Sequence, residues 1–304
     1  MKLSVEFPSV AYREGPEKVT DLGQAIERIG YDEIAVFDHV VMGYPHPGRD
    51  DSRYPPQMPV LEAIVLMTWL AAATKQVGLA TEVLVLPQRQ PALVAKQIST
   101  LDTLSGGRVR LGIGVGWQES EFDALHESFR NRGKRMDEAI ALLRAYFADE
   151  QVDLKGEFYP TAAMAMEPKP PQGAKLPIWI GGLSKAAIRR TALFGDGWMG
   201  SAVGGKEKAV ASRDEIRRQA AEAGRDPAAI GMQMMLQPPP TDEAGKQFYA
   251  DLDVVAARAV ELAELDFEWL AINATAIFQS GSRSVSAIED QLGAIHERLT
   301  AELS

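Results

Sequence analysis

Residues 106–122 read GGRVRLGIGVGWQESEF, and the glycines Gly112, Gly114 and Gly116 fall at every second position. A dinucleotide-binding fingerprint has the spacing G-x-G-x-x-G, which this stretch lacks. Because alternate residues of a β-strand point to the same face, these glycines leave one face of a strand bare. Such a face makes room either for neighbours in a crowded barrel interior or for a ligand at the strand end, and both interpretations stay open here.

On both sides of this strand, the chain alternates between strand and helix patterns. The predicted strands are 3–7, 32–39, 77–86, 108–116, 177–182, 195–200, 230–236 and 267–274. Helices are predicted between them, and the capping-box pattern Ser286…Glu289 is expected to open the last helix. Eight strand–helix units are typical of a closed (β/α)8 barrel or of an open doubly wound sheet. Since composition does not change along the 304 residues, we predict one α/β domain, 1–304, folded as a (β/α)8 TIM barrel.

One segment interrupts the alternation after the fourth strand. Residues of about 151–176 are rich in proline and include Pro160, Pro168, Pro170 and Pro171. Because the strand–helix alternation resumes at 177, this segment is interpreted as an irregular insertion and not as a linker between domains.

Composition and charge exclude several kinds of protein. The chain has no cysteine, which excludes disulfides and thiolate metal sites, and its net charge of −10 argues against a nucleic-acid surface. The first residues, MKLSVEFPSV, lack the apolar core of a signal peptide. The most apolar stretch, 60–73, contains Glu62 and is too short to cross a bilayer. We therefore expect a cytoplasmic protein that binds a small molecule and neither nucleic acid nor membrane.

Chemistry in such a barrel lies at the C-terminal ends of the strands. The second strand ends in Asp38 and His39, and a histidine can exchange protons near neutral pH. On its own the pair is more typical of an ion-paired histidine at a barrel rim. The four histidines include no His-x-His pair, so no metal site is predicted.

Other predicted strands also carry candidate ligand-binding residues. Gly181 and Gly182 precede Ser184 at a helix start, which is typical of an anion site but equally of an N-cap with a tight turn. Glu82 is a carboxylate in an otherwise apolar strand, where it is expected to be paired or to lie beside a cavity. Trp117 and Trp198 offer flat faces, although either could be simple packing at the rim.

Four stretches of the chain resemble the bacterial-luciferase-like flavin and deazaflavin oxidoreductases. They are FDHV (37–40), LATEVLVLPQRQPALVAKQISTLDTLSGGRVRLGIGVGW (79–117), RGKRMDEAIALLR (132–144) and PIWIGGLSKAAIRRTALFGDGW (177–198). Within that family they are most similar to the branch that uses 8-hydroxy-5-deazaflavin, coenzyme F420. Users of FMN share much of the same pattern.

This resemblance implies a homodimeric (β/α)8 barrel with an insertion and with the cofactor ring at its C-terminal mouth. It implies that Asp38 and His39 meet the ring edge, and that a non-prolyl cis peptide joins Glu82 and Val83 against the back of the ring. Gly114 and Gly116 would admit the ring or its chain. The predicted catalytic residues are thus His39 and Asp38, and the predicted cofactor-binding residues are Thr81, Glu82, Val83, Gly114, Gly116, Trp117, Gly181, Gly182, Ser184 and Trp198.

The chain also departs from the family pattern. Relatives that oxidise glucose 6-phosphate carry a tryptophan shortly after the Asp-His pair and a catalytic glutamate after the glycine strand. Here the first region reads VVMGYPHP, and the second has Trp117 with Glu119 two residues on. The sugar-phosphate reaction is therefore not expected, and no catalytic acid can be transferred.

The resulting hypothesis is hydride transfer between F420 and a small organic substrate, with His39 donating or accepting a proton. The loop 40–59 and the insertion are expected to cover the mouth. One alternative is an FMN-dependent monooxygenase, and another is a barrel that binds flavin or deazaflavin without turnover. A metal-free aldolase or isomerase would need a lysine at a strand end, whereas Lys185 belongs to a helix start.

Overall fold

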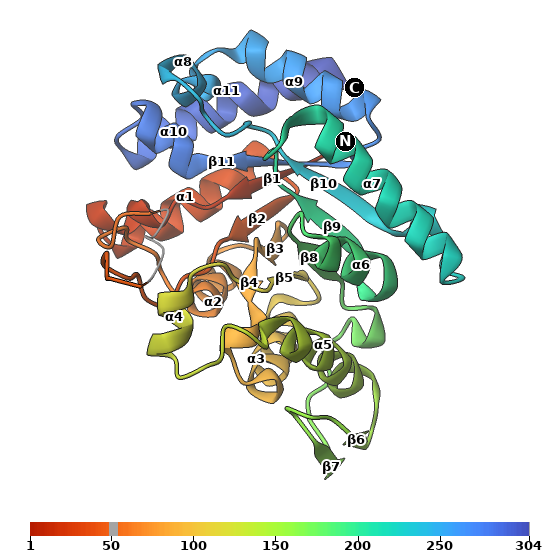
Figure 1. Ribbon diagram of the computed structural model, residues 1–304. Helices are drawn as coiled ribbons and strands as arrows, with labels where there is room; N and C mark the ends of the chain where they lie inside the picture. The colour runs from red at the N-terminus through yellow and green to blue at the C-terminus, as the bar shows by residue number, and fades with distance from the viewer. Residues whose placement is uncertain (49–53, 304) are drawn as a thin grey trace.

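The computed structural model describes residues 1–48 and 54–303, and its central feature is a closed barrel of parallel strands (Figure 1). Around the barrel run β1 (Lys2–Glu6), β2 (Glu33–Val36), β3 (Gly78–Thr81), β5 (Val109–Gly114), β8 (Ile178–Gly181), β9 (Gly197–Gly200), β10 (Gly231–Met235) and β11 (Trp269–Asn273). Pairing of β3 with β5 and of β1 with β11 closes the ring. The predicted (β/α)8 TIM barrel is confirmed.

Helices cover the outside of the barrel. They are α1 (Pro16–Ile29), α2 (Ala63–Ala73), α3 (Pro91–Ser105), α5 (Arg132–Ala148), α6 (Lys185–Phe194), α7 (Gly205–Glu222), α9 (Leu252–Glu264) and α11 (Val285–Leu303). Shorter helices, α4 (Glu119–Ala124), α8 (Glu243–Lys246) and α10 (Ala274–Ser280), lie in the connections. The predicted capping box of α11 is displaced by two residues, because the hydroxyl of Ser284, and not that of Ser286, accepts from the Ala287 N–H.

The proline-rich segment 151–176 is not irregular throughout, as the sequence had indicated. β6 (Val152–Leu154) and β7 (Thr161–Met164) form an antiparallel pair that projects away from the barrel (Figure 1). The structural reason is local, since the Asp153 carboxylate accepts from the Ala163 N–H and ties the two strands together.

Several predicted strands end earlier than their sequences suggested, and β5 ends at Gly114 and not at Gly116. β2 ends at Val36, so Asp38 and His39 lie in the loop that follows it. The third strand is interrupted after Thr81 and resumes as β4 (Leu84–Val85). Between these two pieces the Glu82–Val83 peptide bond is cis, which confirms the expectation from the family resemblance. Glu82 and Val83 therefore stand at the C-terminal mouth of the barrel.

A polar cluster fills the opposite, N-terminal part of the barrel. The Arg110 guanidinium packs between the rings of Trp179 and Trp269, at 4.2 and 4.3 Å from their centres. It donates to both carboxylate oxygens of Glu33 and to Oε1 of Gln233. These side chains therefore fill this part of the barrel interior.

Candidate active site

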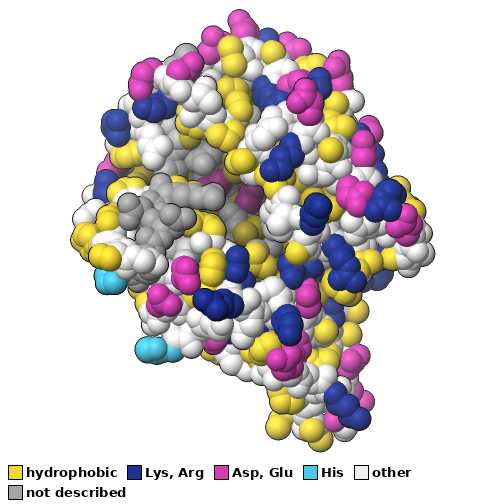
Figure 2. All heavy atoms as spheres, viewed as in Figure 1, with side chains coloured by type: hydrophobic (Ala, Val, Ile, Leu, Met, Phe, Trp, Pro, Cys, Tyr) yellow, Lys and Arg dark blue, Asp and Glu magenta, His cyan; other side chains and the backbone are white. Residues whose placement is uncertain are grey.

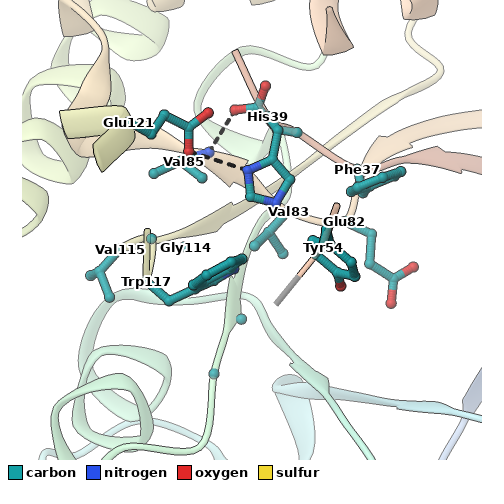
Figure 3. A pocket seen from close by; sticks show the side chains of 14 residues that line it. Phe37, His39, Tyr54, Glu82, Val83, Val85, Gly114, Val115, Trp117 and Glu121 are labelled. Atoms are coloured by element: carbon teal, nitrogen blue, oxygen red, sulfur yellow. Dashed lines mark hydrogen bonds and ion pairs between the residues drawn. The ribbon is translucent and has the colours of Figure 1, made fainter. Parts of the chain in front are cut away.

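A cavity of about 310 Å³ lies at the C-terminal ends of the strands. The molecule is hollowed near the middle of the face shown in Figure 2, and acidic side chains, in magenta, lie inside the hollow. The cavity is lined by Phe37, Asp38, His39, Tyr54, Glu82, Val83, Val85, Gly114, Val115, Gly116, Trp117, Glu121, Gly181 and Gly182 (Figure 3). Its size is in the range of small-molecule sites.

His39 is held in place by Glu121, which comes from the short helix α4. The Nδ1 atom of His39 lies 3.2 Å from Oε2 of Glu121, and both side chains are almost completely buried. The ring also makes edge contacts with Tyr54 and Trp117 at centre-to-centre distances of 5.7 and 5.6 Å. The other ring nitrogen points away from Glu121, towards Val83 and Trp117 (Figure 3).

Glu121 is the centre of a hydrogen-bond network that joins three segments. Its carboxylate accepts from the backbone N–H of Val40, from the backbone N–H of Val41 and from Nε2 of Gln88 at 2.9 Å. Burial raises the pKa of Glu121, but the hydrogen bonds from His39, Gln88 and Val40 outweigh it, and the pKa is lowered overall. An ionised Glu121 accepts the Nδ1–H of His39, which leaves Nε2 as the atom that can exchange a proton in the cavity.

Asp38 lines the cavity, yet both of its oxygens are occupied. Oδ1 accepts from Arg89 at 2.7 Å, and Oδ2 accepts from the backbone N–H of Val85 at 2.9 Å. Burial raises the pKa of Asp38, and the positive charge of Arg89 lowers it, but the effect of burial is larger. In this geometry Asp38 ties the loop after β2 to β4 and thereby positions its neighbour His39.

The glycine strand makes room for Val83. A Cβ on Gly114 would lie 2.6 Å from Cγ2 of Val83, and a Cβ on Gly181 would lie 2.8 Å from its Cγ1. Gly112 is packed more deeply, because a Cβ there would meet the Thr81 carbonyl oxygen. Of the two interpretations of the bare face, crowding applies to Gly112. At Gly114 the glycine accommodates Val83 and also borders the cavity.

The turn after β8 has the geometry of a helix N-terminus. Ser184 caps α6, because its hydroxyl accepts from the Ala187 N–H at 3.1 Å. Gly182 has a φ of 118°, which favours glycine. Trp198 is completely buried, and its indole N–H donates to the Gly182 carbonyl at 2.9 Å. Trp198 thus supports the turn from below and presents no face to the cavity.

Glu82 reaches into the mouth from the loop between β3 and β4. Its Oε1 accepts from Nε2 of Gln233 at 2.7 Å, whereas its Oε2 is buried and has no hydrogen-bond partner among residues 1–48 and 54–303. Burial raises the pKa of Glu82 to about 7, although the charge of Arg110 acts in the opposite direction.

Nine of the twelve residues predicted for the site line this cavity, and three do not. Thr81, Ser184 and Trp198 are absent from the lining, and the Thr81 hydroxyl donates to the Gly112 carbonyl. The sequence reasoning missed Glu121, which lies two residues beyond the Glu119 that it considered. The only available signal was a second acidic residue after the glycine strand.

The predicted covering segments contribute unequally. Tyr54, from the loop 40–59, lines the cavity, whereas no residue of 151–176 does. Residues 49–53 of the same loop lie outside the described residues. Within 1–48 and 54–303, no group of three or more His, Asp or Glu side chains could hold a metal ion. In that same part of the chain, no helix is both long and apolar enough to cross a membrane.

Comparison with known proteins identifies relatives that use two different cofactors. An uncharacterized protein of Mycobacterium tuberculosis is 36% identical over 188 residues, which are 59% of this chain and 63% of that protein. An F420-dependent glucose-6-phosphate dehydrogenase of Nocardia farcinica is 28% identical over 234 residues, 75% of this chain and 66% of that protein. An FMNH2-dependent dimethylsulfone monooxygenase of Pseudomonas putida is 28% identical over 234 residues, which are 76% of this chain and 61% of that protein. The matched region thus spans less than two thirds of each relative.

Solved structures share the fold over nearly the whole chain. The monooxygenase RslO1 from Streptomyces bottropensis has a TM-score of 0.82 at 19% identity, with both chains covered completely. The coenzyme F420-dependent tetrahydromethanopterin reductase from Methanopyrus kandleri has a TM-score of 0.76 at 15% identity, covering 100% of this chain and 99% of that one. The model of the luciferase-like monooxygenase family matches residues 3–267, and the chain belongs to this family, whose members include F420-dependent and FMN-dependent oxidoreductases.

Proposed function

We propose that this protein is an oxidoreductase that binds coenzyme F420 at the mouth of the barrel and uses it for hydride transfer with a small organic substrate. The observation that carries the proposal is the orientation of His39. Glu121 fixes Nδ1 and leaves Nε2 directed into a cavity that also contains Val83 and Trp117. A buried histidine with one nitrogen anchored and the other free is suited to general acid–base catalysis.

The residues of the cavity fit a flat ring with an anionic tail. Val83 forms one wall, and the glycines Gly114 and Gly181 beside it leave room for the Val83 side chain. Gly182 opens the turn before α6, where backbone N–H groups and the positive end of the helix dipole favour an anion. In this proposal Gly181, Gly182 and Ser184 hold the phosphate.

When bound, the cofactor accepts or supplies a hydride, at C5 of a deazaflavin or at N5 of a flavin. Nε2 of His39 would give a proton to the substrate or take one from it. Glu121 would stabilise the imidazolium that forms on His39, since its carboxylate lies next to Nδ1. Asp38 would exchange no proton, because Arg89 and Val85 occupy its oxygens. The apolar walls made by Phe37, Val83 and Trp117 would keep water from the reacting atoms.

Titration of the tryptophan fluorescence with F420 and, separately, with FMN tests the cofactor. Trp117 lines the cavity, so binding of either ring is expected to quench its emission. We expect a low-micromolar Kd for F420, and a Trp117→Phe variant that loses the quenching while a Trp69→Phe variant keeps it. Strong binding of FMN without binding of F420 would instead favour the monooxygenase. Tight binding with no hydride exchange would favour a binding protein.

We also propose that the protein is a homodimer, joined through the exposed apolar face of α2 and α3. Val65, Trp69 and Leu104 are 68%, 51% and 72% exposed, and Leu104 and Trp69 border one groove together with Thr68 and Thr100. Large apolar side chains gathered on one face are typical of a protein interface. A second copy of the chain supplies the same apolar face by symmetry.

A further inference from the structure

Two carboxyl groups lie inside the barrel near its mouth and have no role in the mechanism above. Glu6 is the last residue of β1, and its side chain points to the same side as that of Ser4. The Ser4 hydroxyl donates to Glu33 in the interior polar cluster, so Glu6 also faces inwards, one layer closer to the mouth. Glu82 directly follows β3, and its charge acts on Glu6.

Neither carboxyl group has a full set of partners. Glu6 is only 8% exposed, and within the described part of the chain no hydrogen bond or ion pair reaches its side chain. Glu82 accepts one hydrogen bond, from Gln233, and its buried Oε2 accepts none. A buried oxygen without a donor costs free energy, and Oε2 of Glu82 is such an oxygen.

The charged groups around Glu6 and Glu82 do not supply the missing hydrogen bonds. Arg110 attracts Glu82 but is hydrogen-bonded to Glu33 and to Gln233, so that Gln233 and not Arg110 contacts Glu82. Tyr249 is the remaining titratable group that faces the pair, and its oxygen accepts from the Asn273 N–H. The charges of Arg110 and Glu33 thus act on Glu82, while the charge of Glu82 acts on Glu6.

We propose that Glu82 forms a subsite that accepts a hydrogen bond from an N–H group of the ring bound in the cavity, and that Glu82 and Glu6 together release a proton when that ring binds. This inference rests on the proposed function, because it needs a ring in the cavity that Glu82 lines. The rings of deazaflavins and flavins both carry an imide N–H, so the subsite serves either cofactor.

The proton release follows from the electrostatics of the pair. Burial, together with the negative charge of Glu82, raises the pKa of Glu6 to about 8, and burial raises the pKa of Glu82 to about 7. The two carboxyl groups therefore keep part of their protons near neutral pH. A donor from the ligand stabilises the ionised carboxylate, so that binding expels the proton.

Calorimetric titration at pH 7.5 in two buffers of different ionisation enthalpy tests whether binding releases a proton. The wild-type protein is titrated with F420 and, separately, with FMN, and the difference in heat gives the number of protons exchanged. We expect release of a fraction of a proton in the wild type and loss of that release in Glu6→Gln and in Glu82→Gln. Glu82→Gln should also weaken binding roughly 3–10-fold, the effect of one hydrogen bond. Glu119→Gln, which changes an exposed carboxylate on α4, should behave as the wild type.

The outcomes separate the two proposals. Cofactor binding with no proton released, or with the same release in the wild type and in both glutamine variants, overturns the subsite and leaves the proposed function intact. Proton uptake on binding also overturns the subsite, because it would mean that the carboxyl groups bind the ring in their protonated form, as hydrogen-bond donors. If neither cofactor binds to a wild-type protein that is folded by circular dichroism, both proposals fail.

Discussion

His39 and Glu121 lie 82 residues apart in the chain, and Nδ1 of the histidine is 3.2 Å from Oε2 of the glutamate. The same carboxylate binds the backbone of the loop that carries His39, through the N–H groups of Val40 and Val41. One side chain thus fixes both the position of the loop and the tautomer of the imidazole. Catalysis is expected to depend on this contact more than on Asp38, although Asp38 is adjacent to the histidine.

Replacing Glu121 by glutamine is expected to lower kcat about 10–100-fold, because a neutral amide cannot stabilise a charged His39. Cofactor affinity should change less than about threefold, since the shape of the site is kept. Steady-state kinetics and fluorescence titration measure the two effects. The matched control is Glu119→Gln on the same helix, and equal losses in both variants would contradict the role of Glu121.

His39→Asn is expected to reduce hydride exchange by about 10²-fold or more while the cofactor still binds, because it removes the proton-exchanging nitrogen from the cavity. Stopped-flow absorbance of the cofactor with a panel of small alcohols and carbonyl compounds measures the exchange. A variant as active as the wild type would remove His39 from the mechanism.

The packing of Val83 between two glycines predicts a compensating pair of substitutions. Gly181→Ala would place a Cβ 2.8 Å from Cγ1 of Val83, so the cavity wall must shift. We expect a loss of about 1–3 kcal/mol in the free energy of unfolding, typical of overpacking. The double variant Gly181→Ala/Val83→Ala should recover part of this loss in urea denaturation. No recovery would mean that the clash lies elsewhere.

The stability of the protein should fall as pH rises, in part because of Glu6. Its pKa in the folded protein, about 8, lies above the ordinary value of 4.5. The stabilising contribution of this group is therefore complete below about pH 4.5 and is lost as pH rises to about 8. Glu6→Gln should be more stable than the wild type above pH 8, by on the order of 5 kcal/mol, and equally stable near pH 4. Urea denaturation at the two pH values checks this, and a difference that does not vary with pH would contradict it.

The apolar face of α2 and α3 predicts a dimer that charge can disrupt. The double variant Val65→Glu/Leu104→Glu introduces carboxylates at two positions that are exposed in the single chain. The fold should therefore survive, while association of two copies is lost. Sedimentation velocity should show a dimer for the wild type and a monomer for the variant. The exposed Val254→Glu on α9 serves as the control, and a wild-type monomer would disprove the interface.

The alternation of strands and helices, which depends on local periodicity, was enough to predict the barrel. The resemblance of residues 79–117 was enough to expect the cis bond between Glu82 and Val83. The predicted ends of the elements were less accurate. At β2, for example, the apolar sequence pattern continues beyond Val36, where the strand ends. Packing rather than periodicity decides where a strand stops pairing with its neighbours.

The sequence by itself determined the barrel, the strand ends that form its mouth and the location of His39 beside that mouth. Only the tertiary structure decided which side chains meet there. The contact of Glu121 with His39 and the burial of Trp198 beneath the turn at Gly182 both join segments distant in the chain. Local periodicity reports which face of an element is buried, whereas the partner on that face depends on how the closed barrel brings separate strands together.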